Sequence, residues 1–218
     1  MDASRIASLL EPFLGKNALS TDQLRSISIY IDILQRWNAR INLTAIRDQD
    51  EIVTRHFGES LFAASHLIPN PSAYSAPSPV KAFEVADVGS GAGFPGIPIK
   101  LWAPEISLTL IESNHKKATF LREVTRALTL TDINIQNARA ESLTGKRFDV
   151  VTLRAVEHFE STLPIAASLL NPHGSLTLLI GLSQQPTAQA ILPSANWRLP
   201  VPIPASNSRV LLVGSFAS

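Results

Sequence analysis

The chain has 218 residues, of which 45% are hydrophobic and 17% charged, and its formal net charge is +1. This balance predicts one globular domain with room for a small helical addition, and it excludes a disordered chain. The absence of cysteine excludes a disulfide framework, a thiolate zinc site and a cysteine nucleophile. Because the net charge is close to zero, a nucleic-acid partner would have to bind a local basic patch.

The first part of the chain has a helical period. Ser20 followed by Gln23 is typical of a capping box, and apolar residues then recur at steps of three and four. Asp48 with Glu51 predicts the start of a further helix. We expect residues 1–68 to form an N-terminal helical extension.

A proline-rich stretch follows these helices. Residues 69–79 hold four prolines, separated mainly by serine and alanine. Such a composition carries neither a helix nor a central strand. We therefore expect a loop or linker at residues 69–80 and the main domain at residues 81–218.

After the linker, the chain alternates between strand and helix. Five apolar strands are predicted at residues 83–88, 108–111, 133–135, 148–153 and 176–180. Helical patterns lie near residues 97–102, 115–128 and 163–170. Two more strands, 197–203 and 210–213, leave little room for a crossover helix, which predicts an antiparallel pair at the edge of the sheet. The pattern predicts an α/β fold, a doubly wound Rossmann-like sheet with its ligand at the carboxyl ends of the strands. The apolar runs are far shorter than the roughly 18 residues that cross a bilayer, so a soluble cytoplasmic protein is expected.

The most informative motif is the glycine-rich turn after the first of these strands. Its glycines are Gly89, Gly91 and Gly93. Glycine adopts positive φ and lets the backbone approach a ligand closely, and the helix that follows presents free N–H groups. Glu112 ends the next strand, where its carboxylate can accept hydrogen bonds from both ribose hydroxyls of a nucleoside.

The turn is compatible with two classes of cofactor. Residues 91–96 also satisfy G-x-G-x-x-G, the dinucleotide fingerprint. S-adenosylmethionine is favoured because Asp87, shortly before the first glycine, suits a cofactor with an amino-acid tail and no pyrophosphate. The antiparallel end of the chain also leaves no room for a second mononucleotide-binding half. A glycine turn in an inert scaffold is disfavoured, since the turn coincides with Asp87 and Glu112.

Two further candidate positions follow strands of the predicted sheet. Ala140 and Glu141 come after the third strand, in a loop expected over an adenine, which they would hold through the backbone and a carboxylate. Arg154 ends the fourth strand, directly over the expected pocket. An ordinary polar loop and a structural ion pair are the alternatives. The modest basic excess in residues 115–154 could meet phosphate, although a solvated helix face is the commoner explanation. We find no Ser/His/Asp set and no metal-ligand cluster in the sequence.

Several segments in chain order match one known family. They are residues 34–38 with 41–44, Arg55-His56 with Ser60-Leu61, residues 87–98, residues 120–122, Arg154-Ala155 and residues 209–213. The most specific are the pattern W-N-x-x-x-N-L-T and the ending G-x-P-G-I-P of the glycine turn. On these segments the chain resembles the 16S ribosomal RNA small-subunit methyltransferase G family.

The resemblance implies a seven-stranded class I methyltransferase sheet and S-adenosylmethionine as cofactor. It also implies methylation at N7 of a guanosine, position 527 in the 530 loop of 16S rRNA, in free RNA, the small subunit or an assembly intermediate. Matching positions give the cofactor contacts Gly89, Phe94, Ala140, Glu141 and Arg154. The candidate RNA contacts are Asn38, Asn42, Arg55 and His56, with structural roles as the alternative. Guanine N7 already has a lone pair, so no catalytic acid or base and no metal is expected. We expect a monomer.

The sequence departs from the family pattern at several positions. Glu59 stands where aspartate is usual, and Ile180 stands where lysine usually precedes the glycine. Glu157 and His158 stand where small residues are commoner. Three other functions stay open on the residues alone: a small-molecule methyltransferase, a non-catalytic binding module that retains the fold, and a nicotinamide-dependent oxidoreductase.

Overall fold

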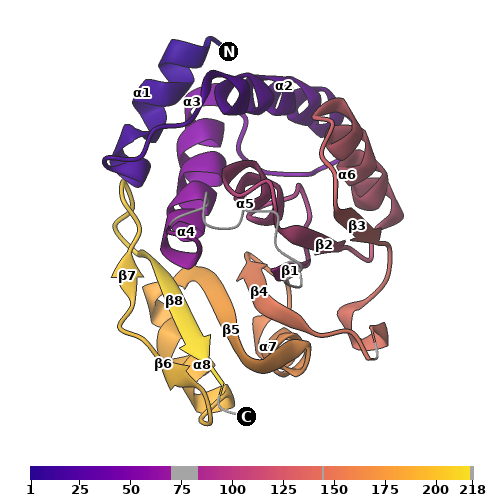
Figure 1. Cartoon of the computed structure of the whole chain (residues 1–218), viewed down its shortest axis with the longest axis vertical. Helices are drawn as coiled ribbons and strands as arrows, with labels where there is room; N and C mark the ends of the chain where they lie inside the picture. Colours follow the sequence, from indigo (N-terminus) through magenta and orange to yellow (C-terminus); the bar gives the residue numbers. More distant parts are fainter. Residues whose placement is uncertain (70–82, 144, 217–218) are drawn as a thin grey trace.

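The computed structural model describes residues 1–69, 83–143 and 145–216. Apart from its first residue, the linker expected at 69–80 lies outside the described residues. A mixed sheet runs through the molecule, and helices cover both of its faces (Figure 1). Within the described ranges, no helix is both long and apolar enough to cross a membrane.

The N-terminal region is helical, as predicted. Its elements are α1 (Ala3–Leu14), α2 (Thr21–Asn38), α3 (Gln49–Glu51), the π-helix η1 (Ile52–Gly58) and α4 (Glu59–Leu67). The capping box is confirmed, because Ser20 Oγ accepts a hydrogen bond from Gln23 N–H at 3.2 Å and Gln23 Oε1 accepts one from Ser20 N–H at 2.7 Å. The start at Asp48 is also confirmed, since its carboxylate accepts from Glu51 N–H at 2.9 Å. The helix expected after it contains the π-helical turn η1, a feature that often occurs at functional sites.

The sheet has the predicted order of parallel and antiparallel strands. Its strands are β1 (Glu84–Val88), β2 (Ser107–Ile111), β3 (Ile133–Gln136), β4 (Phe148–Arg154), β5 (Leu170–Gly181), β6 (Asn196–Trp197), β7 (Val201–Pro202) and β8 (Arg209–Ser215). The order is β3-β2-β1-β4-β5-β8-β6, with β7 also paired to β8. Strands β1 to β5 pair in parallel, and β8 is antiparallel to β5, β6 and β7. The strand expected at 197–203 is thus two short strands, because Pro200 between them lacks the N–H that a ladder needs.

The remaining α-helices lie on the two faces of this sheet (Figure 1). They are α5 (Gly96–Trp102), α6 (His115–Ala127), α7 (Phe159–Ser168) and α8 (Gln185–Ile191). Two short 3₁₀-helices, η3 (Ala140–Ser142) and η4 (Leu182–Gln184), follow β3 and β5. Helices α5 and α6 share one hydrophobic cluster with α1, α2 and α4, and α7 and α8 contribute to a second cluster. The N-terminal helices are therefore packed on the sheet domain through a common core. The order of strands reverses between β1 and β4, which places a ligand site at their carboxyl ends.

An aromatic cluster joins the N-terminal helices to the glycine turn. The ring of Tyr30 stacks on that of Phe94 with centroids 5.3 Å apart, and Phe57 meets both rings edge-on at 5.2 and 5.1 Å. The Tyr30 hydroxyl donates a hydrogen bond to the carbonyl of Ala92. Such aromatic pairs stabilise by about 0.5–1.5 kcal/mol beyond their buried area. The N-terminal helices thus fix the position of the turn.

Replacement of Gly93 by alanine should destabilise this junction. Gly93 has φ +84, and an added Cβ would lie 2.7 Å from Ile97 Cδ1 and 3.1 Å from Leu121 Cδ2, against the Tyr30 hydroxyl. We expect the free energy of unfolding to fall by about 2–4 kcal/mol, because strain at positive φ adds to overpacking. Urea denaturation measures this change in the free energy of unfolding. Gly15→Ala is the control: Gly15 has φ +58, but no atom from the described part of the chain lies within 4 Å of a Cβ added there. Equal losses in both variants would show that packing against Tyr30 contributes nothing.

Candidate functional site

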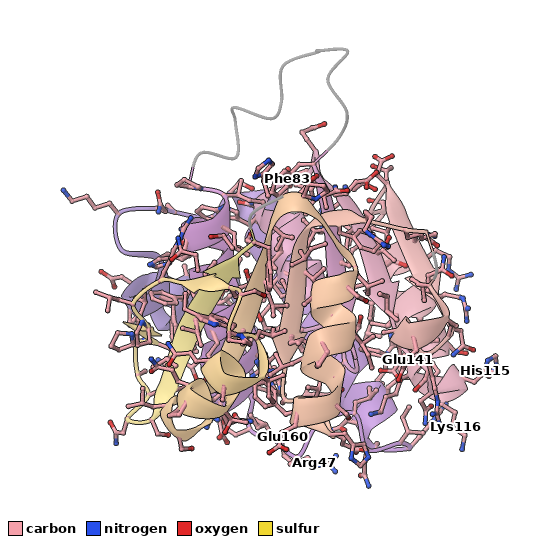
Figure 2. All side chains as sticks on the ribbon, turned by 90° about the horizontal axis from the view of Figure 1, so that it is seen from below. Arg47, Phe83, His115, Lys116, Glu141 and Glu160 are labelled. Atoms are coloured by element: carbon pink, nitrogen blue, oxygen red, sulfur yellow. The ribbon has the colours of Figure 1, made fainter. Side chains whose placement is uncertain are left out.

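A cavity of about 830 Å³ opens at the carboxyl ends of β1, β2 and β4. In Figure 2, Phe83, which precedes β1, lies at one end of the sheet, and His115, Lys116 and Glu141 lie at the opposite end, where the strands finish. The cavity wall includes these sequence-predicted residues: His56, Gly89, Gly91, Phe94, Glu112, Ala140, Glu141 and Arg154. Asp87, Gly93, Asn38, Asn42 and Arg55 do not line it.

The glycine turn forms the centre of the wall. Gly89 and Ser90 donate backbone hydrogen bonds to the carbonyl of Ile111 at 2.9 and 3.1 Å, which ties the turn to β2. Gly91 has φ +56, and within the described ranges only the Gly89 carbonyl oxygen, at 3.7 Å, lies within 4 Å of a Cβ added there. The space beside this backbone is therefore open, as a ligand that approaches the turn requires.

Glu112 supplies a fixed carboxylate next to the turn. Its Oε2 accepts a hydrogen bond from Gly91 N–H at 2.9 Å, and its Oε1 accepts one from Asn114 N–H at 2.7 Å. The side chain is buried. A carboxylate has about four lone-pair sites, so each oxygen retains a position for a ribose hydroxyl. The backbone contacts hold the carboxylate in place before any ligand binds.

Asp87, before the turn, and Gly93, within it, face the core and not the cavity. The Asp87 carboxylate is 1% exposed; its Oδ1 accepts from the Thr152 hydroxyl at 2.9 Å and its Oδ2 from Gly96 N–H at 3.2 Å. Burial raises the pKa of Asp87 to about 7. The structure thus gives Asp87 and Gly93 roles in holding the start of α5 and packing α2, where the sequence suggested direct cofactor contact. The sequence showed both residues in the motif but not which way they face.

The residues proposed to contact RNA lie in different surroundings in the structure. Asn38 is buried: its Oδ1 accepts from the N–H groups of Leu43 and Thr44 at 3.0 and 3.1 Å, and its Nδ2 donates to the Thr44 carbonyl at 3.0 Å. It therefore shapes the loop that forms part of the cavity wall, and direct contact with RNA does not fit this placement. Asn42 is exposed, and Arg55 pairs with Glu59 at 3.0 Å.

His56 is the candidate RNA contact that reaches the cavity wall. Its ring stacks on Phe94 with centroids 4.7 Å apart, and its Nε2 lies 2.8 Å from the Thr44 hydroxyl. Burial, together with the positive charges of Arg154 and two other arginines, lowers the pKa of His56 to about 3. The imidazole is therefore neutral in the folded protein at physiological pH.

Sequence reasoning noted Ala155, Glu157 and His158 through the family pattern, but it did not place the segment that follows β4 in the cavity wall. Val156 lines the cavity, and its Cγ1 would lie 2.9 Å from a Cβ added to Gly89. Ala155 and His158 on either side have φ 50 and 56, a left-handed conformation that is uncommon for residues other than glycine and often occurs at functional sites. No glycine or asparagine marks these positions, so the sequence carried no signal for their left-handed backbone conformation.

Comparisons with known proteins identify relatives that span most of this chain. A family model described as rRNA small subunit methyltransferase G matches residues 23–191. A ribosomal RNA small subunit methyltransferase G from Xanthomonas campestris pv. campestris (strain B100) is 33% identical over 195 residues, covering 89% of this chain and 85% of the relative. The protein of the same name from Halorhodospira halophila is 39% identical over 163 residues, covering 75% and 72%.

The chain belongs to the rRNA small subunit methyltransferase G family. It is an S-adenosylmethionine-dependent rRNA methyltransferase. The crystal structure of a ribosomal protein L11 methylase from Lactobacillus delbrueckii subsp. bulgaricus has the same fold: the TM-score is 0.58 at 21% identity, over 74% of this chain and 80% of that one.

The residues of this methyltransferase G family member fit the cofactor. The open space beside Gly91 and the unused acceptor positions of Glu112 suit a nucleoside that carries an amino-acid tail. Ala140 and Glu141 lie in the wall at η3, and Arg154 lies at the end of β4. Among the residues that the structure describes, no group of three or more His, Asp or Glu side chains is placed to hold a metal ion.

The departure from the family pattern at Ile180 has a structural explanation. Ile180 is 4% exposed and belongs to the hydrophobic cluster that includes Leu163 of α7 and Ala188 of α8. It does not line the cavity. In this member of the methyltransferase G family, the position therefore contributes to the core on the face opposite α4.

Replacement of His56 by glutamine should change how stability depends on pH. Between pH of about 3 and 6.5, His56 is neutral in the folded chain and protonated in the unfolded chain, so acid favours unfolding. Lowering the pH through this window should destabilise the wild type relative to the variant by about 1.4 kcal/mol per pH unit. Urea denaturation from pH 7 to 5 measures it. Both proteins share Asp87, whose raised pKa acts in the opposite direction, so the difference isolates His56. If the free energy of unfolding changed with pH in the same way in both proteins, the lowered pKa of His56 would be contradicted.

Proposed function

We propose that the protein methylates N7 of a guanosine in the 530 loop of 16S rRNA. The observation that carries the proposal is that the motif residues Gly91, Glu112 and Arg154, distant in the sequence, meet in one cavity at the carboxyl ends of the strands. Family membership supports small-subunit rRNA as the substrate. We further propose that the protein acts in the cytoplasm as a monomer, on the small subunit or an assembly intermediate.

The residues of the cavity have distinct tasks in this proposal. When bound, S-adenosylmethionine supplies an electrophilic methyl group on a positively charged sulfur. Glu112 would accept hydrogen bonds from the ribose hydroxyls, and Ala140 and Glu141 would contact the adenine. The backbone of Gly89 and Gly91 would border the amino-acid tail, and Arg154 would hold the cofactor from the end of β4.

The remainder of the cavity would receive the acceptor base. The cavity wall includes residues 43–45 of the loop after α2 and Val156 and Glu157 of the segment after β4, and we assign these residues to the acceptor base. Guanine N7 has a lone pair at neutral pH, so the chain does not need to remove a proton. Its contribution is alignment of the two reactants, which alone can lower a barrier by about 7–11 kcal/mol.

A methyl-transfer assay tests the proposal. Labelled S-adenosylmethionine is incubated with 30S subunits from a strain that lacks the modification, with naked 16S rRNA and with free nucleosides in parallel, and the labelled base is mapped. Label at guanine N7 in the 530 loop is the expected result. Label at another base, or turnover on small molecules without RNA, would show a different acceptor.

A further inference from the structure

A buried glutamate joins three arginines beside the cavity. Glu59, the first residue of α4, is 1% exposed. Its Oε1 accepts a hydrogen bond from Arg55 Nε at 3.0 Å, and its Oε2 accepts one from Arg154 Nη2 at 3.1 Å. Arg209 Nη2 forms an ion pair with the same Oε2 at 3.1 Å. The three guanidinium groups come from η1, β4 and β8 and converge on one carboxylate.

These contacts restrict the guanidinium of Arg154. Nη2 donates to the Arg55 carbonyl at 2.8 Å as well as to Glu59, and Nε donates to Glu59 Oε2 at 3.4 Å. Nη1 is then the guanidinium nitrogen for which the described residues supply no acceptor. Because Arg154 lines the cavity, its orientation there is set by α4 and η1 and not by β4 alone.

Among the described residues, positive charge exceeds negative charge in this cluster. One buried carboxylate faces three guanidinium groups, and Glu51, which is half exposed, lies 3.8 Å from Arg55 Nη1. The buried Asp87 also interacts electrostatically with Arg154, but burial raises its pKa to about 7, so it supplies only part of a negative charge at neutral pH. Buried ion pairs contribute little net stability compared with apolar packing of similar volume. The excess of positive charge is better explained by an anionic ligand group than by stability of the fold.

We propose that Glu59 is a positioning residue that orients Arg154 toward a negatively charged group of the substrates. The inference rests on the proposed function, because Arg154 is assigned there to the cofactor. The anionic group has two possible sources, the α-carboxylate of the cofactor and a phosphate of the RNA. In both cases Glu59 acts through Arg154 and does not touch the ligand.

Binding of S-adenosylhomocysteine to the full-length protein tests the role of Glu59. Glu59→Gln removes the charge but keeps the side-chain volume. If Arg154 faces the cofactor carboxylate, the affinity of this variant measured by calorimetry should fall by about 10- to 100-fold, as expected for a misaligned binding group. Glu59→Asp keeps the charge and should stay within about threefold of the wild type. Glu51→Gln is the matched control, because Glu51 also pairs with Arg55 but has no contact with Arg154. It should bind like the wild type.

A double-mutant cycle separates positioning from a general effect on the fold. If Glu59 acts through Arg154, Glu59→Gln should weaken binding by less than about twofold in an Arg154→Ala background. If the affinity losses of the two single variants multiply in the double variant, the inference is overturned. If the single variant Glu59→Gln does not fold, the double variant Glu59→Gln with Arg209→Gln takes its place in the cycle. This double variant removes one negative and one positive charge.

Two further measurements identify the source of the anionic group. If it is the cofactor carboxylate, Glu59→Gln should leave the affinity for methylthioadenosine, which lacks that carboxylate, unchanged. If it is an RNA phosphate, S-adenosylhomocysteine affinity should stay unchanged, while KM for RNA rises and the slope of log K against log salt falls by about 0.7–0.9. A Glu59→Gln variant unchanged in every measurement refutes the inference. A wild type that does not bind S-adenosylhomocysteine refutes the proposed function instead.

Discussion

Replacement of Gly89 by valine should abolish useful binding of S-adenosylmethionine. Gly89 has φ +69, and an added Cβ would lie 2.9 Å from Val156 Cγ1. A β-branched residue at this φ is strained by about 1–3 kcal/mol, and overpacking against Val156 adds about 1–3 kcal/mol. The turn can relax only by moving Val156 or by moving its own backbone, and both form the cavity wall. We therefore expect the affinity for S-adenosylhomocysteine, measured by calorimetry, to fall on the order of 100-fold or more.

Gly145→Val is the matched control for backbone strain. Gly145 has a similar φ of +78, but no atom of the residues that the structure describes lies within 4 Å of a Cβ added there, and Gly145 is not among the described residues that line the cavity. It should lose some stability and keep its affinity for the cofactor. Near-wild-type affinity in a folded Gly89→Val variant would remove the basis for placing the cofactor at this turn.

Replacement of Arg154 by alanine should reduce methyl transfer while the protein stays folded. Truncating a buried, hydrogen-bonded charged side chain at a binding site typically costs about 2–5 kcal/mol, so kcat/KM should fall on the order of 100-fold. The fold should survive, because Glu59 retains Arg55 at 3.0 Å and Arg209 at 3.1 Å and is not left as an unpaired buried charge. The free energy of unfolding should change by less than about 2 kcal/mol. Steady-state kinetics and urea denaturation measure the two effects.

The control for Arg154 is Arg209→Ala. Arg209 contacts the same carboxylate oxygen of Glu59 at the same distance of 3.1 Å, but it does not line the cavity. It should therefore affect cofactor binding much less than Arg154→Ala. A folded and fully active Arg154→Ala variant would mean that Arg154 serves only the ion-pair cluster.

Together these experiments divide the site into a cofactor part and an ion-pair part. Gly89 is expected to act on the shape of the turn, and Arg154 on the charge that faces the cavity. His56 links the two, because it stacks on Phe94 and its pKa is lowered partly by Arg154. A variant that changed cofactor affinity, methyl transfer and the pH dependence of stability to the same extent would indicate a general loss of packing.

Short-range features of the sequence determined most of the fold. The capping box at Ser20, the start at Asp48 and the alternation of strand and helix depend on residues within a few positions of one another, so they can be read locally. The glycine turn and Glu112 each follow a predicted strand, so the order of elements along the chain predicted a cofactor site at the strand ends. The π-helical turn η1 and the split of the strand expected at 197–203 were not predicted.

The direction in which each side chain faces was decided only by the tertiary structure. Asp87 and Gly93 belong to the same motif as Gly91, yet packing of α2 and α5 turns them away from the cavity. Glu59 and Arg154 are 95 positions apart in the chain and meet because α4 covers the end of β4. A sequence pattern indicates the periodicity of apolar residues and the position of turns, whereas these contacts depend on how distant elements pack against one another.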